Sequence, residues 1–520
     1  MCKLTLTAGL CLIIASLASS SRLVCYYNSL AENRAEDGRF TVSDIDPNQC
    51  THLIYAFSDI NNQHQLVPSS ETDIQRYQSF TGLKTRNPLL KTLLAVGGLT
   101  FDTTKFRTMV AAQQKRANFI LSAITLMRTF GFDGLNLDWR YPRGARSQPR
   151  DKQRFTQLCK ELKEAFVAEG TATNRDRLIV TASVSAERAT IDASYEVAQI
   201  ATYLDFINVL TFDFHGPWES VTGHHSPLYR GSRDTGDKIY SNTDSAMKYW
   251  RDKGAPSQKL NLGLAAYGRV FTLSSAFSNV GAPASGPGKE GHFTGEEGFW
   301  ASYETCLYVR KSTIHLIPDQ RVPYAKTKDQ WVGFDNNTSL DIKVSYLKNN
   351  NFGGAFVWSL DLDDFNGQFC KQGNYPFISN LHKLLVPDFP GLTTPTPTTT
   401  TPTTPTKVST GNPCDGKSDG VYTNPDDPNS FYNCAGQITY IQKCQPGLIF
   451  KQSCKCCDWP TTTTPTKVPT GNPCDGKSDG VYTNPDDPNS FYNCAGQITY
   501  IQKCQPGLIF KQSCKCCDWP

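Results

Sequence analysis

The sequence predicts a parallel (β/α)8 barrel that is followed by two small disulfide-rich β modules. Three observations lead to this prediction. Eight short apolar runs, rich in β-forming residues, alternate with helical stretches over residues 22–392, as barrel strands and their crossovers do. A segment made almost only of Thr and Pro follows at 393–410, and a pattern of six cysteines then occurs twice in the last 110 residues. Such cysteine density is typical of modules held together by disulfides in an oxidising compartment.

The first 21 residues have the features of a signal peptide. Lys3 precedes an apolar run over residues 4–17, and small residues follow at 18–21. This run is short for a bilayer span, so we expect secretion rather than a membrane anchor. The 52 Lys and Arg residues nearly balance 48 acidic residues, and no basic stripe is present. We therefore expect no nucleic-acid partner. No later segment is apolar enough to span a membrane, so we expect no membrane partner either. We also expect a monomer.

The barrel strands are expected at the eight apolar runs. These lie at residues 23–27, 52–57, 92–97, 132–139, 178–183, 206–212, 260–266 and 354–360. A helical pattern separates several of them, for example over 106–130, where apolar residues recur at three- and four-residue spacing. The long gap before the eighth run leaves room for an inserted subdomain. An open doubly wound sheet is the alternative, but no Gly-rich phosphate loop follows the first strand.

The fourth run carries polar side chains where a barrel places its chemistry. Side chains alternate along a strand, so Asn136, Asp138 and Arg140 share one face. The strand is expected to end near Tyr141, which brings this face to the C-terminal mouth of the barrel. Polar groups in an apolar strand cost free energy unless they have partners or a function. An inward polar layer that only holds the strand is the structural alternative.

This strand resembles the chitinase signature of glycoside hydrolase family 18, D-G-x-D-x-D-W-E-Y-P. Further motifs of that family occur in the same order, namely AVGG at 95–98, LTFDFHG at 210–216, AYGR at 266–269 and GGAFVW at 353–358. The resemblance implies a (β/α)8 barrel over 22–392 with an α+β insertion after strand seven, at about 269–350. It also implies retaining hydrolysis of β-1,4-linked N-acetylglucosamine, in which the substrate's acetamido group attacks and the last acidic residue of the signature protonates the leaving oxygen.

The sequence departs from the family pattern at three site positions. Arg140 stands at the general-acid position, and a guanidinium stays protonated at any working pH. Asn136 replaces the family's inner Asp, and Phe212 replaces a Tyr that would bond the acetamido carbonyl. General acid catalysis typically contributes about 10²–10⁴-fold. We expect Asp138 to pair with Arg140, and no catalytic set is intact among Asn136, Asp138, Arg140, Phe212 and Asp213.

The same resemblance implies which barrel residues would contact a sugar. They are Tyr27, Gly97, Gly98, Trp139, Tyr141, Asp213, Trp218, Tyr267, Arg269 and Trp358. Trp358 corresponds to the residue that forms the floor of the family's cleavage subsite. An aromatic residue there is significant because sugar faces stack on aromatic rings. The family usually has Trp where this chain has Leu30 and Leu99, so distal subsites should be weaker. Neither a cofactor nor a metal is expected.

The C-terminal modules, at 411–460 and 471–520, are joined by a second Thr/Pro linker at 461–470. Residues 410–460 are identical to 470–520, and about fifty residues are too few for a large core. Each module resembles the peritrophin-type chitin-binding domain, with CKCCDW at its close. Trp459 and Trp519 are the predicted sugar platforms. The alternative of an extracellular structural or signalling protein that does not bind sugar would need the aromatic residues of these modules to be buried.

Disulfides are expected to hold each module and to brace the barrel. The module cysteines are Cys414, Cys434, Cys444, Cys454, Cys456 and Cys457, and then Cys474, Cys494, Cys504, Cys514, Cys516 and Cys517. Their connectivity has fifteen possibilities per module, and zinc is the less favoured alternative because the signal-peptide pattern predicts an oxidising compartment. In the barrel, the family resemblance implies the pairs Cys25–Cys50 and Cys306–Cys370. We predict a secreted protein that binds chitin and lacks hydrolase activity; the alternative is an active endo-chitinase with a reorganised site.

Overall fold

The computed structural model describes residues 21–140 and 150–389, together with parts of the two modules between residues 414 and 518. The chain divides into two units, residues 1–396 and 397–520. The predicted signal peptide, apart from Ser21, lies outside the described residues, as do both predicted Thr/Pro linkers.

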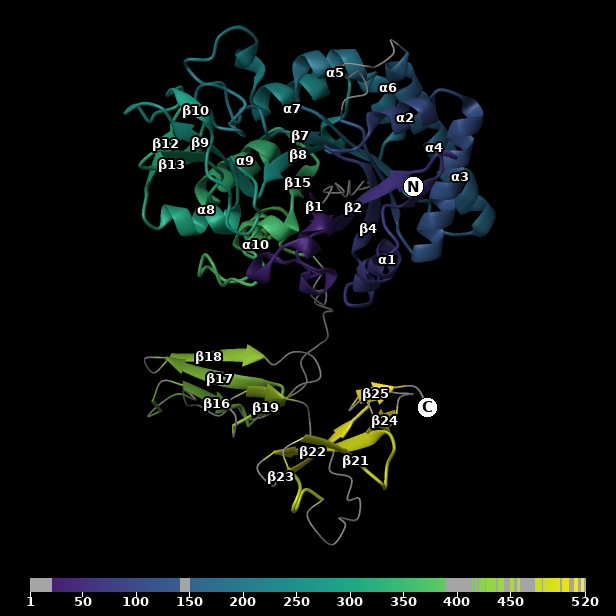
Figure 1. The fold of residues 1–520 in the computed structure, drawn as a ribbon, viewed down its shortest axis with the longest axis vertical. Coiled ribbons are helices and arrows are strands. Elements are labelled where there is room, and N and C mark those ends of the chain that lie inside the picture. The colour runs from purple at the N-terminus through teal and green to yellow at the C-terminus, as the bar shows by residue number, and fades with distance from the viewer. Residues whose placement is uncertain are drawn as a thin grey trace, which may run out of the picture. The chain divides into compact units, whose positions relative to one another are not determined.

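Eight parallel strands close into a barrel in the large unit (Figure 1). They pair in the order β1, β15, β8, β7, β6, β5, β4 and β2, and β1 pairs again with β2. Their bounds are β1 (Arg22–Asn28), β2 (His52–Ile60), β4 (Lys91–Gly97), β5 (Gly134–Asp138), β6 (Ile179–Ser185), β7 (Phe206–Leu210), β8 (Leu260–Ala265) and β15 (Gly354–Trp358). The short strand β3 (Leu66–Pro68) pairs antiparallel with β2. The predicted barrel is confirmed, and every one of the eight apolar runs contains a barrel strand.

Helices surround the barrel (Figure 1). They are α1 (Asp73–Gly82), α2 (Thr103–Val110), α3 (Gln113–Phe130), α4 (Asp151–Thr173), α5 (Arg188–Ser194), α6 (Val197–Tyr203), α7 (Thr243–Asp252), α9 (Asn337–Asn349) and α10 (Pro376–Leu385). The helical pattern over 106–130 belongs to two helices rather than one, because the backbone at Ala112 is extended (φ −137°, ψ 147°). The side chain of Asp102 caps the first of them, accepting a hydrogen bond from Thr104 N.

A six-stranded antiparallel sheet forms the insertion after β8. It consists of β9 (Tyr267–Leu273), β10 (Ala284–Pro287), β11 (Phe299–Ala301), β12 (Thr313–Ile317), β13 (Val322–Thr327) and β14 (Gln330–Gly333), with helix α8 (Ser302–Val309). The α+β insertion therefore follows the seventh barrel strand, as predicted. Its sheet ends at Gly333, well before residue 350, because the next segment forms α9, which packs against α10 on the outside of the barrel.

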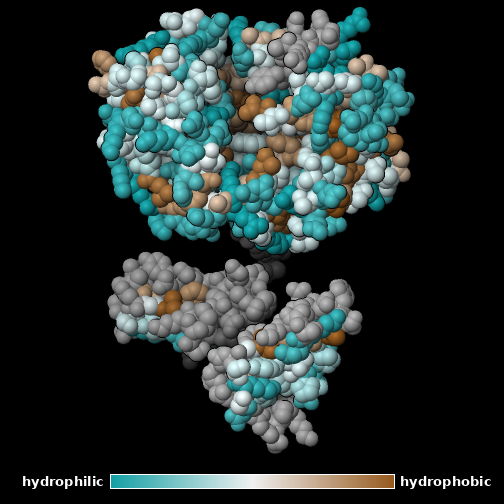
Figure 2. All heavy atoms as spheres, viewed as in Figure 1, coloured by the Kyte–Doolittle hydropathy of each residue, from teal (hydrophilic) through white to brown (hydrophobic). Residues whose placement is uncertain are grey.

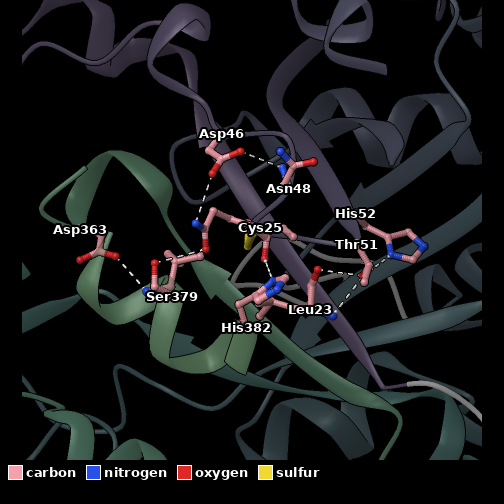
Figure 3. The surroundings of a disulfide bond; sticks show 12 residues. Leu23, Cys25, Asp46, Asn48, Thr51, His52, Asp363, Ser379 and His382 are labelled. Atoms are coloured by element: carbon pink, nitrogen blue, oxygen red, sulfur yellow. Dashed lines mark hydrogen bonds between the residues drawn. A yellow bond between two sulfur atoms is a disulfide. The ribbon is translucent and has the colours of Figure 1, made fainter. Parts of the chain in front are cut away.

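A disulfide and the last helix fix the start of the barrel (Figure 3). Cys25 in β1 is bonded to Cys50 in the loop before β2. His382 of α10 lies with Nδ1 2.9 Å from the carbonyl oxygen of Gln49 in that loop. At the other end of α10, the Asp363 carboxylate accepts hydrogen bonds from the backbone amides of Phe377 and Ile378. Cys306 and Cys370 form a second bond, whereas Cys159 is a buried free thiol whose pKa burial raises.

The barrel strands form a buried core, and the visible surface of the large unit is mostly polar (Figure 2). All residues of β5, β7 and β8 are buried. Figure 2 shows hydrophilic residues over most of the visible face of the large unit, with hydrophobic residues gathered in a hollow near its middle. Within the described residues, none of the helices is both long enough and apolar enough to cross a membrane.

Each module contains a three-stranded and a two-stranded antiparallel sheet. The first has β16 (Gly420–Thr423), β17 (Ser430–Ala435), β18 (Ile438–Lys443), β19 (Ile449–Lys451) and β20 (Cys456–Asp458), and the second has β21 (Gly480–Thr483), β22 (Ser490–Ala495), β23 (Ile498–Lys503), β24 (Ile509–Lys511) and β25 (Cys516–Asp518). The bonds Cys414–Cys434 and Cys474–Cys494 lie in the two small cores. Cys504 is also disulfide-bonded. The side chains of the other predicted module cysteines lie outside the described residues.

Candidate functional site

A cavity of about 550 Å³ opens at the C-terminal mouth of the barrel, where the parallel strands end. Side chains from different strands and from the insertion meet there. Among the residues predicted from the sequence, those that line it are Gly97, Arg140, Phe212, Asp213, Tyr267, Arg269 and Trp358. The cavity therefore brings together seven of the fourteen predicted barrel residues.

Asp138 and Arg140 form the ion pair that the sequence predicts. Arg140 Nε lies 2.8 Å from Asp138 Oδ1, and Nη2 lies 3.5 Å from Oδ2. The Asp138 side chain is fully buried and does not line the cavity, whereas 11% of the Arg140 side chain is exposed. The guanidinium thus stands between the cavity and the carboxylate.

Asn136 belongs to a buried polar network inside the barrel. Its Nδ2 donates to Tyr26 Oη at 2.9 Å and to Ser183 Oγ at 3.2 Å, while its Oδ1 accepts from Thr181 Oγ1 at 2.8 Å. Tyr26 and Ser183 also bond each other. Burial and the nearby charge of Asp138 raise the pKa of Tyr26. Because every partner of Asn136 is a hydroxyl, which can donate or accept, the amide is satisfied where a carboxylate would also fit.

Two aromatic rings, those of Trp358 and Phe57, form the floor of the cavity. Trp358 ends β15 and is half-buried. Phe57 stacks beside it, with ring centroids 5.9 Å apart and planes inclined by 21°. The Arg140 guanidinium carbon lies 5.8 Å from the Trp358 ring centroid, a cation–π distance.

Asp213 is held ionised on the insertion side of the cavity. Arg269 donates to both its carboxylate oxygens, at 2.8 and 3.1 Å, and the buried His225 has Nδ1 3.7 Å from Oδ1. Burial raises the pKa of Asp213, but His225 and Arg269 lower it by more, so the pKa lies well below its usual range. Arg269 also lies against the ring of Trp218, a predicted contact residue that is 61% exposed but does not line the cavity.

Phe212 and Tyr267 close the remaining wall. Their rings meet edge to face, with centroids 6.1 Å apart, and Tyr267 stacks on Phe299 at 4.6 Å. Burial and the charge of Asp213 raise the pKa of Tyr267 well above its usual value, so its hydroxyl stays protonated. Phe212 presents only hydrocarbon to this wall.

The structure corrects two predicted contact residues, Tyr27 and Trp139. Both side chains are almost fully buried and neither lines the cavity. Tyr27 packs among the rings of Tyr55 and Phe80, and the indole of Trp139 bonds Thr103 and stacks on Phe106. The physical reason is strand alternation. Tyr27 and Trp139 each follow an inward-facing residue, Tyr26 and Asp138, so their side chains point outward to the helices.

Gly97 and Gly98 act through their backbone. Both have φ in the left-handed region, +116° and +101°, which favours glycine. A Cβ on Gly97 would lie 2.2 Å from the carbonyl oxygen of Asp138, and Gly98 N donates to that same oxygen. These glycines let the end of β4 approach β5 closely, but only Gly97 borders the cavity.

At the outer rim, Leu30 and Leu99 are 68% and 64% exposed and line the cavity. Tyr141, Trp459 and Trp519 lie outside the described residues. Tyr26 and Phe57 are site residues that the sequence prediction missed. The first strand is apolar at successive positions, so its pattern alone could not show which of the two tyrosines faces inward.

Family comparisons agree with this geometry. Residues 22–363 match the model of glycosyl hydrolases family 18, and residues 414–465 and 474–520 match the chitin binding Peritrophin-A domain. The chain belongs to glycosyl hydrolase family 18. It is a chitinase-family protein with two chitin-binding domains, as the sequence motifs predicted.

Relatives in this family differ in their catalytic status. Chitotriosidase-1 of Mus musculus is 46% identical over 455 residues, which is 86% of this chain and 97% of that protein. Chitinase-3-like protein 2 of Homo sapiens is 44% identical over 376 residues, which is 72% of this chain and 95% of the relative. The solved structure of human YKL-39, described as a pseudo-chitinase with retained chitooligosaccharide binding properties, matches with a TM-score of 0.68 and 45% identity; it covers 70% of this chain and all of that one.

Proposed function

We propose that this protein is a secreted chitin-binding protein that does not hydrolyse chitin. One observation carries the proposal: Arg140 stands at the general-acid position and is paired with the buried Asp138. Cleavage of a glycosidic bond requires a proton on the leaving oxygen. A guanidinium does not release its proton at a working pH, and its positive charge opposes the charge that develops on the sugar ring.

The other carboxylates along the described lining are poorly suited to replace the acid. Asp59 is bonded through both oxygens to Lys105, and Asp102 caps α2. The pKa of Asp213 is held well below its usual range. Glu296 is 61% exposed at its side chain and lies 3.5 Å from Arg269. A general acid works best when its pKa lies near the operating pH, and Arg269 and His225 hold that of Asp213 far from it.

Asn136 and Phe212 weaken the site further. Asn136 cannot share a proton with Asp138 as a second carboxyl group would. Phe212 has no hydroxyl to donate to an acetamido carbonyl, and a missing hydrogen bond in such a site costs about 0.5–1.5 kcal/mol. Three functional groups are missing from one site. This supports loss of catalysis rather than transfer of the general-acid role to another residue.

Sugar binding is supported by what remains. Aromatic side chains such as Phe57, Phe101 and Phe299 line the cavity, and sugar rings stack on aromatic faces. Both C-terminal modules belong to a chitin-binding family, and YKL-39 is described as retaining chitooligosaccharide binding. Secretion is supported by the signal-peptide pattern and by the disulfides, which persist outside the reducing cytosol.

The test is to measure retention on insoluble chitin and release of reducing ends by the same purified full-length protein. The proposal predicts retention without release. Release above the buffer blank would overturn the claim of inactivity, and failure to be retained would overturn the claim of chitin binding.

A further inference from the structure

We infer that Arg140 occupies the central sugar position of the barrel cavity with its own side chain. The barrel would then bind a short oligomer or a chain end on one flank, rather than a chain that runs through the cavity. This inference rests on the proposed function, because it assumes that the cavity takes N-acetylglucosamine oligomers.

The position of Arg140 over Trp358 is the first step. Its guanidinium carbon lies 5.8 Å from the Trp358 ring centroid, and the group lines the cavity. A sugar in van der Waals contact with the indole would have its atoms roughly 4 Å from the ring. Guanidinium and sugar therefore compete for the same space above the floor.

Arg140 is also anchored where it stands. Asp138 is fully buried and receives Arg140 Nε at 2.8 Å. Swinging the guanidinium aside would leave that fully buried carboxylate without its counter-ion, which is costly. The side chain is thus held as part of the cavity rather than as a mobile cover.

The flanks of the cavity remain open. Trp358 ends β15, which pairs with β1 on one side and with β8 on the other. The β1 flank carries Leu30, and the β8 flank carries Tyr267 and Arg269. Both flanks line the cavity, whereas Arg140 lies over the floor between them.

The experiment compares the N-acetylglucosamine trimer and hexamer on the full-length protein. Protection from hydrogen exchange in the peptide around 354–360 is followed against ligand concentration, so that barrel binding is measured separately from the modules. Arg140→Ala is the variant. Arg188→Ala is the matched control. Arg188 lies on α5, away from the cavity, and its guanidinium also lies over aromatic rings, those of Tyr240 and Tyr249.

In the natural protein and in Arg188→Ala, trimer and hexamer should bind the barrel with nearly equal affinity. In Arg140→Ala, the hexamer should bind about two- to tenfold more tightly than the trimer, as expected for one added aromatic stacking contact. Equal length dependence in all three proteins, with clear protection, would overturn the role of Arg140 and leave barrel binding standing. Protection by neither ligand in any protein would overturn both the inference and sugar binding by the barrel.

Arg140→Ala leaves Asp138 unpaired and could unfold the barrel. The double variant Arg140→Ala/Asp138→Asn removes that buried charge and should show the same gain for the hexamer. A double variant that is folded, as judged by its thermal transition, and that shows no gain would also contradict the inference.

Discussion

Arg140 and Asp138 differ in their exposure to solvent, and this difference determines how much stability is lost when each is removed. Arg140 borders the cavity, whereas the Asp138 side chain is fully buried. Removing the carboxylate leaves a cation that water in the cavity can solvate, but removing the guanidinium leaves a buried, unpaired anion.

We therefore predict that Arg140→Ala lowers the free energy of unfolding by about 3 kcal/mol or more, and that Asp138→Asn lowers it by only about 1 kcal/mol. Chemical denaturation of the full-length protein measures both values. If the two substitutions cost the same, or if neither costs anything, the ion pair does not hold the site as described.

Sequence reasoning placed Asn136, Asp138 and Arg140 together, but it did not find all of their neighbours. The shared face of Asn136, Asp138 and Arg140 follows from strand alternation, and so does the ion pair. The sequence did not show which of Tyr26 and Tyr27 faces the barrel interior, because β1 is buried on both faces and lacks a polar-apolar alternation. Phe57 was missed because its contact with Trp358 joins β2 to β15, which are distant in sequence.

At the scale of single elements, the end of β4 depends on Gly97. Its φ of +116° is strained for other residues, and a Cβ there would meet the Asp138 carbonyl at 2.2 Å. Gly97→Ala should lower the free energy of unfolding by about 3 kcal/mol or more. Gly82→Ala, at the end of α1 with open space around its Cβ position, is the control and should be neutral or stabilising by up to about 1 kcal/mol. Thermal or urea unfolding distinguishes the two; equal effects would contradict the close approach of β4 and β5.

The carboxyl group of Asp363 binds the first backbone amides of α10, and its pKa changes on folding. Burial raises the pKa of Asp363 to about 7, although backbone hydrogen bonds partly oppose this. Between its usual pKa and about 7, the folded state holds a proton that the unfolded state releases, so this group's contribution to stability falls as pH rises through that window. Above pH 7 it adds no further slope.

Asp363→Asn cannot titrate, so its unfolding free energy should fall less steeply between pH 4 and 7 than that of the natural protein. The comparison is a series of urea titrations, with Asp388→Asn, which removes an exposed carboxylate just beyond α10, as the control. A variant whose profile parallels the natural protein would show that Asp363 does not carry this dependence.

The order of the elements was predictable where local pattern and topology agree. Eight apolar runs with helical crossovers leave few alternatives to a barrel, and the insertion appeared as a long gap. The break between α2 and α3 was not predictable, because apolar spacing continues across it while the Ala112 backbone turns to an extended conformation.

For the whole molecule, we expect the two identical modules to act together on an insoluble polymer. Tethered domains that reach one surface gain about 10²–10⁴-fold in avidity over one domain. Trp459→Ala or Trp519→Ala alone should therefore remove most retention on chitin, and the double variant should remove nearly all that the modules provide. Retention measured against chitin concentration checks this. Single variants that bind like the natural protein would show that these tryptophans are not the sugar platforms.

The central claim is that hydrolysis was lost at Arg140, Asn136 and Phe212. Its most direct test is the release of reducing ends from chitin oligosaccharides by the full-length protein and by the triple variant Arg140→Glu/Asn136→Asp/Phe212→Tyr. We predict no release by the natural protein and measurable release by the variant, because the hydroxyl network around Asn136 accepts a carboxylate and the glutamate restores a proton donor. Turnover by the natural protein would mean that another group supplies the proton, and would contradict this account.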